Sequence, residues 1–582
     1  MSVGPAPCLL APLLVASTAL ASSPGPGGDE ARRAGAPRRD LLLIKLSATP
    51  ALPNEGTDGA IGILDFDQLV RSLGATAVRP VFRRPPRGRR DPAGADALGI
   101  DRWVRLELGR ERDDLAALAR RFEALRSVER AEPDRSVMPA VVPDDPDYST
   151  AQWSLKPDRA DAETAWNVDT DSSEHVIFVI DTGVETTHGD IAANLWINPG
   201  EIAGNGLDDD GNGFVDDVHG WNFASDNPDV SDTWGHGIHV NGIIGAAGDN
   251  STQVAGIHWS CRLAQGRIFD QRAAMWSVAA AATVYAADQG AIATNNSWGD
   301  SDPGPQVFVD AMRYAAGLDV LQVAAAGNQG NTGLSWPAAY DEMVSVASTD
   351  SADLLSWFSS HGDWIDMAAP GEAIFNLWVN QGTASLSGTS MASPHVAGAG
   401  ALLRSVNPQL TAEETRVTLR SMSDDLGAPG YDADFGHGRL DIARAVDAAA
   451  AIRLSTRTPT RPGTVDVMLD APGEANMVHV LLAGWSGIDP GLELSGFDPA
   501  DSRILPLNHD LLVQFQLNRP FNGVTSGFIG TLDAAGRAVA TFHVAGGDVF
   551  AGRTISLCFC TLDPNDLDHV RFVSAPLSFV VP

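Results

Sequence analysis

Cysteine, lysine and long apolar runs are scarce in this sequence. Of four cysteines in 582 residues, Cys8 precedes the first apolar run, and the odd number that remains excludes a full disulfide framework in an exported protein. We expect these three to be buried: Cys261, Cys558 and Cys560. Beyond residue 20, no run of 18 apolar residues without a charge suggests a membrane span. Only two lysines occur and the net charge is −34, so the clustered cations of a nucleic-acid-binding protein are missing.

The charge that is present is unevenly distributed. Residues 29–139 hold 21 basic and 18 acidic side chains, whereas residues 140–582 hold 19 basic and 56 acidic ones. This asymmetry is consistent with docking of the first part onto the second, and equally with drift in composition. The length predicts several domains, and the ordinary apolar content predicts folded ones.

The N-terminus is typical of an export signal over residues 1–21. An apolar run from Leu9 to Leu20 ends in the small-x-small pattern of Ala19-Leu20-Ala21, although no Lys or Arg precedes it. We therefore expect a secreted, extracellular protein, with attachment to the cell surface left open. Residues 22–39 are rich in Gly, Pro, Ser and Arg, which predicts a flexible segment.

Residues 40–137 show the order strand, helix, strand, strand, helix, strand, which predicts a ferredoxin-like α+β unit. The strands are expected at 41–46, 77–82, 103–108 and 128–131, and the helices at 66–73 and 113–125. A proline-containing linker follows over 138–150.

Two further domains are expected after the linker. Residues 151–452 contain continuous apolar runs such as 176–180 and 320–325, which predict a parallel sheet flanked by helices. Residues 455–582 contain short alternating segments between turns, which predict an all-β sandwich whose role the sequence does not indicate.

Four polar residues in the α/β domain follow strands or begin helices. Asp181 ends an apolar strand, His236 stands between two glycines, Asn328 follows a run of alanines, and Ser390 opens a helix of small residues with Pro394 expected in its first turn. Each has an ordinary structural explanation by itself: a turn residue for Asp181 and Asn328, a core histidine, and a capping serine.

Together, the segments Asp181-Thr182-Gly183, His236-Gly237 and Gly388-Thr389-Ser390-Met391-Ala392, with Asn328, resemble the motifs of the subtilisin-like serine proteases (subtilases). The resemblance implies an α/β catalytic domain over 151–452 and acyl transfer through a nucleophilic Ser390. It also implies His236 as general base, Asp181 as its orienting acid, and Asn328 with the Ser390 N–H as oxyanion donors. Two residues depart from the usual pattern: Ile238 and Asn241.

The resemblance extends to substrate contacts and to maturation. It implies a peptide-pairing edge and pocket walls at six positions: Ser297, Trp298, Gly299, Ala326, Gly327 and Ser335. Small residues at such walls would accept medium or large apolar side chains. It also implies that residues 40–137 are an inhibitory prosegment removed by a cut in the 138–150 linker.

Residues 205–217 predict a structural calcium site. Asp208, Asp210 and Asn212 fall at positions one, three and five of a calcium loop, with Asp216 at nine, but position twelve is His219 and Asp217 is the candidate substitute. A solvated acidic turn is the alternative. Asp190 also aligns with a calcium ligand of the family, which is a weaker indication.

The leading hypothesis is a secreted serine endopeptidase that is made as a zymogen and acts as a monomer. Its partners would be peptide or protein substrates and its own prosegment, and calcium would be a structural cofactor. The alternative is a weakly active or inactive binding protein that acts through its C-terminal β domain, motivated by Ile238 and Asn241. A third hypothesis is an exported protease that processes a few partners.

Overall fold

The computed structural model describes most of the chain, and the following concerns those residues only. They are residues 37–50, 60–82, 99–108, 115–135, 141–270, 273–460, 463–475, 477–489, 492–493, 504–508, 525–526, 528–533, 535–544, 551–564 and 566–582. The expected signal segment over 1–21 and most of the expected flexible segment lie outside them. No helix in the described part of the chain combines the length and apolar character needed to cross a bilayer.

The N-terminal unit has the expected order of elements. They are β1 (Pro37–Leu46), α2 (Leu64–Leu73), β2 (Ala75–Pro80), η1 (Ile100–Arg102), β3 (Trp103–Leu108), α4 (Leu115–Glu123) and β4 (Val128–Arg135). The antiparallel sheet has the order β2-β3-β1-β4, so β4 is an edge strand as predicted. Both helices bury a phenylalanine in the core, and the rings of Phe66 and Phe122 lie 5.4 Å apart.

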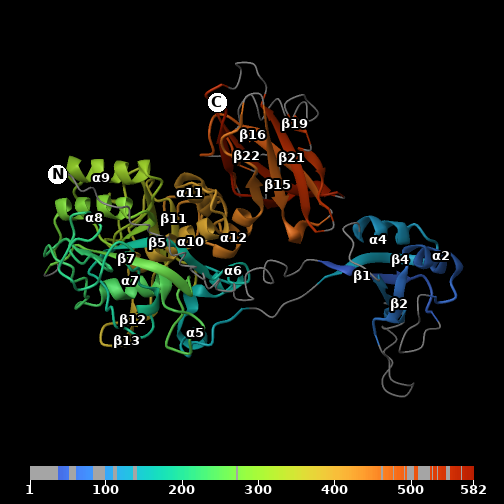
Figure 1. The fold of residues 1–582 in the computed structure, drawn as a ribbon, viewed down its shortest axis with the longest axis horizontal. Coiled ribbons are helices and arrows are strands. Elements are labelled where there is room, and N and C mark those ends of the chain that lie inside the picture. The colour runs from blue at the N-terminus through green and yellow to red at the C-terminus, as the bar shows by residue number, and fades with distance from the viewer. Residues whose placement is uncertain are drawn as a thin grey trace, which may run out of the picture.

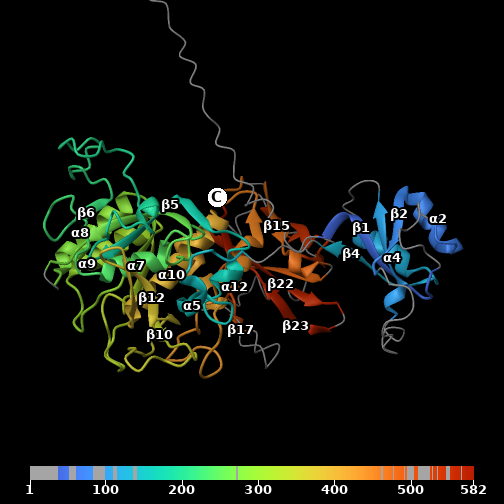
Figure 2. The ribbon, with the colours of Figure 1, turned by 90° about the horizontal axis from the view of Figure 1, so that it is seen from below.

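This N-terminal unit lies apart from the α/β domain, on the side opposite α8 and α9 (Figures 1 and 2). The docking that the charge asymmetry suggested is therefore not the arrangement of this structure.

The α/β domain is built on a seven-stranded parallel sheet of order β11-β10-β9-β8-β5-β7-β6. Its strands are β5 (Asp171–Asp181), β6 (Gly220–Asn222), β7 (Ser260–Arg267), β8 (Ala291–Asn296), β9 (Leu321–Ala325), β10 (Met343–Thr349) and β11 (Met367–Pro370). The sheet confirms the predicted subtilisin-like α/β architecture. Because all its strands run the same way, their carboxyl ends meet at one edge, where ligands bind in such sheets.

Helices cover both faces of the sheet, as the continuous apolar strands require. They are α5 (Tyr148–Ala151), α6 (Ala162–Ala165), α7 (His236–Gly245), α8 (Trp276–Asp288), α9 (Gln306–Gly317), α10 (Thr389–Val406), α11 (Ala412–Ser421) and α12 (Ile442–Ala450), with short 3₁₀ turns η2 (Trp153–Leu155) and η3 (Ala192–Asn194). Along β5, Ile177 and Val179 pack in the core with α7, α10 and α12, whereas Phe178 and Ile180 pack with α8 and α9. A hairpin of β12 (Ile374–Trp378) and β13 (Gly382–Leu386) lies beside α7.

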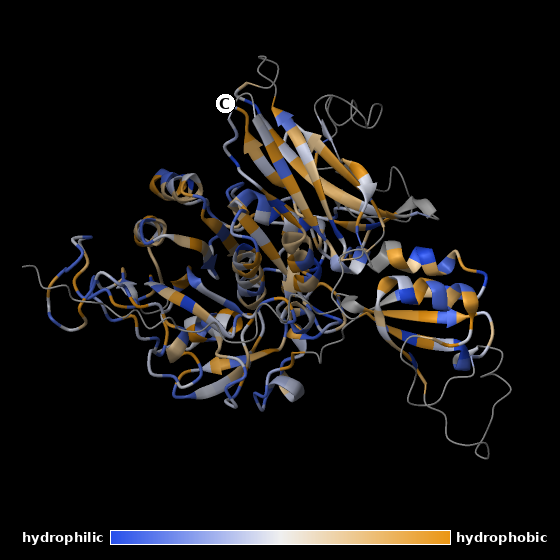
Figure 3. Cartoon of the chain, turned by 45° about the vertical axis from the view of Figure 1, so that its right-hand side comes forward, coloured by the Kyte–Doolittle hydropathy of each residue, from blue (hydrophilic) through white to orange (hydrophobic). Residues whose placement is uncertain are grey.

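The C-terminal region forms the expected β sandwich. Its strands are β14 (Ile452–Leu454), β15 (Gly463–Asp470), β16 (Val478–Gly484), β17 (Leu492–Glu493), β18 (Ile504–Leu505), β19 (Thr525–Ser526), β20 (Ile529–Thr531), β21 (Arg537–Val544), β22 (Thr554–Asp563), β23 (Asp566–Val573) and β24 (Leu577–Val580), with η4 (Pro472–Glu474). One sheet has the order β14-β15-β21-β19. The other has the order β20-β16-β22-β23, and β24 also pairs with β22. Polar and apolar positions alternate along these strands (Figure 3).

The two β sheets face each other across a shared core, in which the rings of Phe542 and Phe579 lie 5.3 Å apart. The three described cysteines are buried, as predicted. The sandwich is attached to the α/β domain by polar contacts: Arg457 forms an ion pair with the buried Glu414 at 2.7 Å, and the Ala575 N–H donates to the Ala448 carbonyl at 3.0 Å.

Candidate active site

Asp181 and His236 meet at the carboxyl edge of the sheet. Asp181 is the last residue of β5 and is fully buried, and its Oδ1 accepts from His236 Nδ1 at 2.7 Å and from the Thr182 N–H at 2.7 Å. This hydrogen bond places the ring proton of His236 on Nδ1. Nε2 is therefore the nitrogen that can accept a proton, which is the arrangement a general base needs.

The two glycines beside His236 allow α7 to begin against other groups. Gly235 caps the helix with φ +101°, and a Cβ there would lie 2.6 Å from the Trp378 ring. A Cβ on Gly237 would lie 2.2 Å from the Gly183 carbonyl oxygen. Side chains at these positions would push His236 away from Asp181, so the Gly-His-Gly pattern is a packing requirement of the site.

A buried aspartate that the motifs did not indicate holds the turn before α7. One oxygen of Asp232 accepts from the backbone N–H groups of Trp234 (2.8 Å) and Gly235 (2.9 Å), and the other accepts from that of Ile238 (3.0 Å). Three otherwise unpaired donors at the helix N-terminus are thus satisfied by one carboxylate.

Burial lowers the pKa of His236, but the charge of Asp181 and its hydrogen bond outweigh burial, with a smaller contribution from the charge of Asp232. The pKa of His236 is therefore raised above its usual value. An imidazole accepts a proton only when it is neutral, so this shift moves the range in which the His236 ring can accept a proton to higher pH.

Ser390 stands in the first turn of α10, where backbone N–H groups lack partners within the helix. Its Oγ donates to the Ser297 carbonyl at 3.1 Å. Among the hydrogen bonds of the described residues, none joins Ser390 to His236. The hydroxyl is thus paired with the backbone of the neighbouring edge, and catalytic hydrogen bonds commonly tighten only when substrate binds.

The expected place of Pro394 in the first turn of this helix is wrong. The helix begins at Thr389, so Pro394 is its sixth residue and cannot donate to the Ser390 carbonyl one turn earlier. The hydroxyl of Ser297 donates to that carbonyl instead, at 2.8 Å. The proline therefore leaves the Ser390 carbonyl without a helical donor, and the Ser297 hydroxyl, just after β8, takes that place.

Asn328 is exposed and lies next to the start of α10. Its Oδ1 accepts from the N–H (2.9 Å) and the hydroxyl (3.0 Å) of Thr389, and that hydroxyl accepts from the Gly327 N–H at 3.0 Å. These contacts orient the amide, so that its Nδ2 lies 3.4 Å from the position a Cβ on Gly388 would take. The Nδ2 donor thus lies beside the turn that carries Ser390.

The residues expected to contact substrate lie at the ends of β8 and β9. Ser335 is buried, and its Oγ would lie 3.0 Å from a Cβ on Gly299 and 2.9 Å from a Cβ on Gly327, so small residues are needed at both places. Ala326 is buried behind them. The Trp298 ring instead packs edge-on against Trp276 and Phe308, which leaves the backbone of Trp298 as the part available for pairing with peptide.

The two departures from the family pattern are accommodated in the core. Ile238 is fully buried. Asn241 and Gln265, both fully buried, form a reciprocal amide pair: Asn241 Nδ2 donates to Gln265 Oε1 at 3.1 Å, and Gln265 Nε2 donates to Asn241 Oδ1 at 2.7 Å. Asn241 also donates to the Gly237 carbonyl at 2.8 Å. The pair links α7 to β7, the strand next to the one that bears Asp181.

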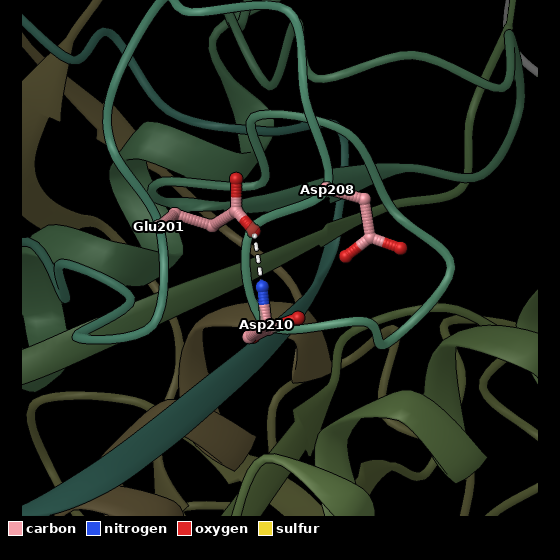
Figure 4. Close-up of side chains that lie close together, drawn as sticks. All are labelled: Glu201, Asp208 and Asp210. Carbon is pink, nitrogen blue, oxygen red and sulfur yellow. Dashed lines mark hydrogen bonds between the residues drawn. The ribbon is translucent and has the colours of Figure 1, made fainter. Parts of the chain in front are cut away.

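Three carboxylates gather in the acidic loop that precedes β6: Glu201, Asp208 and Asp210 (Figure 4). Each offers one oxygen, and these oxygens lie within 4.8 Å of one another. At that separation each pair of like charges repels by about 1 kcal/mol even in water. Glu201 was not predicted, because it lies seven residues before Asp208 and outside the loop pattern.

The other predicted ligands of this loop have hydrogen-bond partners elsewhere. Asp216 accepts from the N–H groups of Asn205 and Gly206. Asp217 is fully buried and accepts from Asn212 Nδ2 at 2.9 Å and from the Tyr285 hydroxyl at 2.5 Å, which fastens the loop to α8. Of the predicted aspartate ligands in this loop, Asp208 and Asp210 therefore belong to the cluster of carboxylates, whereas Asp216 and Asp217 do not.

Asp190 is fully buried and accepts from Asn250 Nδ2 at 2.8 Å and from the Val254 N–H at 3.0 Å. Burial raises the pKa of Asp190 to about 7, with contributions from the negative charges of Asp145 and Asp147.

Comparison with known proteins identifies relatives of the α/β domain. The model of the subtilase family matches residues 172–438. Thermitase from Thermoactinomyces vulgaris is 34% identical over 305 residues, which cover 52% of this chain and 99% of thermitase. Halolysin from Haloferax mediterranei is 28% identical over 498 residues, which cover 84% of this chain and 85% of halolysin. A solved protease structure from Pseudoalteromonas arctica is 27% identical, and the match covers 53% of this chain and 100% of that protease chain, with a TM-score of 0.46.

Proposed function

Because the chain belongs to the subtilase family and is a serine-type endopeptidase, we propose that it cleaves peptide bonds with Ser390 as nucleophile, His236 as general base and Asp181 as the orienting acid. The observation that carries this assignment is the 2.7 Å hydrogen bond from His236 Nδ1 to the buried Asp181, at the sheet edge from which α10 presents Ser390.

In the proposed reaction, Ser390 Oγ leaves the Ser297 carbonyl and attacks the scissile carbonyl carbon while its proton passes to His236 Nε2. The C–N bond then breaks, and His236 returns the proton to the leaving amine. Water repeats the sequence: it attacks the acyl carbon, gives a proton to His236, and releases the acid as Ser390 regains its proton. Asp181 stabilises the imidazolium that forms in each half.

The developing oxyanion is proposed to accept hydrogen bonds from Asn328 Nδ2 and the Ser390 N–H. Thr389 holds the other end of the Asn328 amide, so the donor needs no reorientation during the reaction, which is the condition under which such a donor is most effective. Removal of one oxyanion donor of this kind typically costs about 10²–10³-fold in turnover.

A calcium ion is the proposed structural cofactor. Glu201, Asp208 and Asp210 supply the hard oxygen donors that calcium prefers, and their mutual repulsion in its absence is the observation that fits the ion to the site. The bound ion would offset two of the three negative charges of this cluster and hold Glu201 to the loop that contains Asp208 and Asp210. Chelation should lower the melting temperature of the wild type, and this effect should shrink in Glu201→Gln but not in Asp434→Asn, an exposed carboxylate elsewhere. Equal effects of chelation in all three proteins would refute the site.

Secretion as a zymogen is also proposed, with residues 40–137 as the inhibitory prosegment. The alignment with halolysin, which covers 84% of this chain and 85% of halolysin, supports a similar layout of the two chains. The end of the linker is already held by the catalytic domain: Asp144 accepts from the N–H and hydroxyl of Ser251, and the Asp147 N–H donates to Gln253. A cut after this anchored stretch would have to detach it, so the mature N-terminus is expected at the beginning of the 138–150 linker, before residue 144. N-terminal sequencing of the secreted protein tests this position.

The central test is labelling with a fluorophosphonate probe, together with hydrolysis of casein. The wild type and Ser351→Ala, which changes an exposed serine outside the site, should be labelled and active, whereas Ser390→Ala should be neither. Equal hydrolysis by wild type and Ser390→Ala would eliminate the proposal. The binding-protein alternative is motivated by Ile238 and Asn241, and because both are buried and Asn241 is paired, no observation favours it over catalysis.

A further inference from the structure

A pair of buried amides lies behind the helix that bears His236. Asn241 lies on α7, five residues after His236, and Gln265 lies on β7; both side chains are fully buried. Each amide donates to the oxygen of the other, at 3.1 Å and 2.7 Å. Burying amides is costly, and two apolar side chains of the same shape can be nearly as stable as a satisfied polar pair. Packing alone therefore does not explain why polar side chains occupy these two positions.

The pair acts on the first turn of α7, where one glycine is held from two sides. Asn241 Nδ2 donates to the Gly237 carbonyl at 2.8 Å, and the Gly237 N–H donates to Thr182 Oγ1 at 2.7 Å. Gly237 directly follows His236, and Thr182 directly follows Asp181. The residue after the proposed base is thus bonded to the residue after its acid, and Asn241 holds the other end of that same glycine.

Gln265 ties Asn241 to the sheet. β7 pairs with β5 in parallel, and Gln265 lies opposite Val179, two residues before Asp181. On its other side the Gln265 N–H donates to the His219 carbonyl at 3.0 Å. The backbone of Gln265 is therefore fixed by neighbours on both sides, and its amide gives Asn241 a rigid point of attachment next to the strand that bears the acid.

The position of the base depends on this turn. His236 is the first residue of α7, so a shift of the turn moves its ring relative to the Asp181 carboxylate, which lies 2.7 Å from Nδ1. A misplacement of about 1 Å can cost about 10²-fold in rate, even when the mutation lies away from the chemistry. Asp232 binds N–H groups of the turn, whereas Asn241 binds the Gly237 carbonyl, so the two residues hold different sides of it.

We propose that Asn241 is a positioning residue for the reaction: fixed by Gln265, its amide holds the Gly237 carbonyl and keeps the His236 ring on Asp181. This inference rests on the proposed function, because it takes His236 as the general base. Among the hydrogen bonds of the described residues, none joins Asn241 or Gln265 to the positions expected to contact substrate at the ends of β8 and β9. The loss of Asn241 should therefore lower kcat and leave KM nearly unchanged.

The experiment compares the wild type with Asn241→Leu, with Asn241→Leu/Gln265→Met and with the control Asn407→Leu. Asn407 is also a fully buried amide, but it lies at the C-terminal end of α10, where it donates to two backbone carbonyls at 2.9 Å and 3.1 Å. Hydrolysis of a peptide amide gives kcat and KM across pH, at a temperature well below the lowest melting temperature. Titration with a fluorophosphonate probe gives the concentration of working nucleophile, and melting is measured in the Ser390→Ala background.

The double variant separates positioning from stability. Both polar partners are gone in it, so it should melt within a few degrees of the reference, yet it lacks the hydrogen bond to Gly237. We expect kcat to fall by about tenfold or more in Asn241→Leu and in the double variant, with KM within about twofold of the wild type. Asn407→Leu should show the opposite pattern: a lower melting temperature with the kcat of the wild type.

The pH profile gives a second readout that lost stability would not change. Burial lowers the pKa of His236, but Asp181 and, to a smaller extent, Asp232 raise it overall. A looser contact between His236 and Asp181 should therefore move the acid limb of kcat to lower pH in both Asn241 variants, while the acid limb of Asn407→Leu stays in place.

A double variant with the kcat of the wild type would overturn the proposal, because the pair would then serve stability alone. An acid limb that stays in place in both Asn241 variants, or an equal loss of kcat in Asn407→Leu, would overturn it as well. If Asn241→Leu does not fold, the double variant still decides. A wild type that neither reacts with the probe nor cleaves the peptide would instead overturn the proposed function, so the two failures are distinguishable.

Discussion

Replacing Asn241 alone should destabilise the protein more than replacing Asn241 and Gln265 together. In Asn241→Leu the fully buried Gln265 amide loses both partners that Asn241 offers, a donor at 3.1 Å and an acceptor at 2.7 Å. Each buried polar group left unpaired costs about 1–3 kcal/mol, so the single change should cost about 2–6 kcal/mol. In Asn241→Leu/Gln265→Met both polar partners are gone, and a change of that kind can be nearly neutral.

Thermal unfolding in a Ser390→Ala background, which prevents self-digestion, measures this coupling. With roughly 2–4 °C per kcal/mol for a domain of about this size, Asn241→Leu should melt roughly 10 °C below the reference and the double variant within a few degrees of it. Val539→Thr, an exposed change in the C-terminal sandwich, should add to Asn241→Leu without coupling. The reasoning is refuted if the decrease in melting temperature of Asn241→Leu/Gln265→Met equals the sum of the decreases caused by Asn241→Leu and by Gln265→Met alone. The two side chains would then have no energetic coupling.

Three further predictions concern pH and charge. Asp181→Asn removes the charge that raises the pKa of His236, so the acid limb of kcat/KM should move to lower pH while turnover falls by about 10⁴-fold, measured by peptide hydrolysis across pH; an unmoved acid limb would contradict the assignment. Burial lowers the pKa of both His258 and His395 to about 4, so the stability that each gives as a neutral ring is complete above pH 6.5 and lost as the pH falls toward 4, at most about 3 kcal/mol each; melting temperatures that stay constant between pH 7 and 4 would contradict this. Cutting the ion pair between the sandwich and the α/β domain with Arg457→Met should leave Glu414 buried without its charge partner and destabilise the catalytic domain by about 3–5 kcal/mol in thermal unfolding, whereas Arg537→Met, at an exposed ion pair, should change it by less than about 1 kcal/mol.

The parts of the fold and site that could be predicted from sequence depend on local patterns. The apolar run before Asp181 predicts a strand buried on both faces. The structure places Asp181 at the end of β5, where its carboxylate accepts a hydrogen bond from His236. The elements of the N-terminal unit were predicted to within a few residues because helical and strand periodicities alternate cleanly there.

The parts that were missed depend on contacts between distant segments. Glu201 joins Asp208 and Asp210 only because the loop folds back, and no spacing within the sequence marks it. The position of Pro394 was wrong by one turn, because the serine motif suggests where α10 begins but not which residue starts it; the free carbonyl that results is satisfied by Ser297, 93 residues earlier. The asymmetry of charge did not predict the position of the N-terminal unit either, because net charge says little about a specific interface.

Asp232 joins the turn before α7 to the start of the helix that carries His236. Its two oxygens hold the N–H groups of Trp234 and Ile238, which lie on either side of His236 in the chain. A change at this buried carboxylate would therefore move the backbone on both sides of His236 and, with it, the hydrogen bond from His236 Nδ1 to Asp181. It follows that the geometry of the proposed base depends on a residue outside the motifs that the sequence indicates.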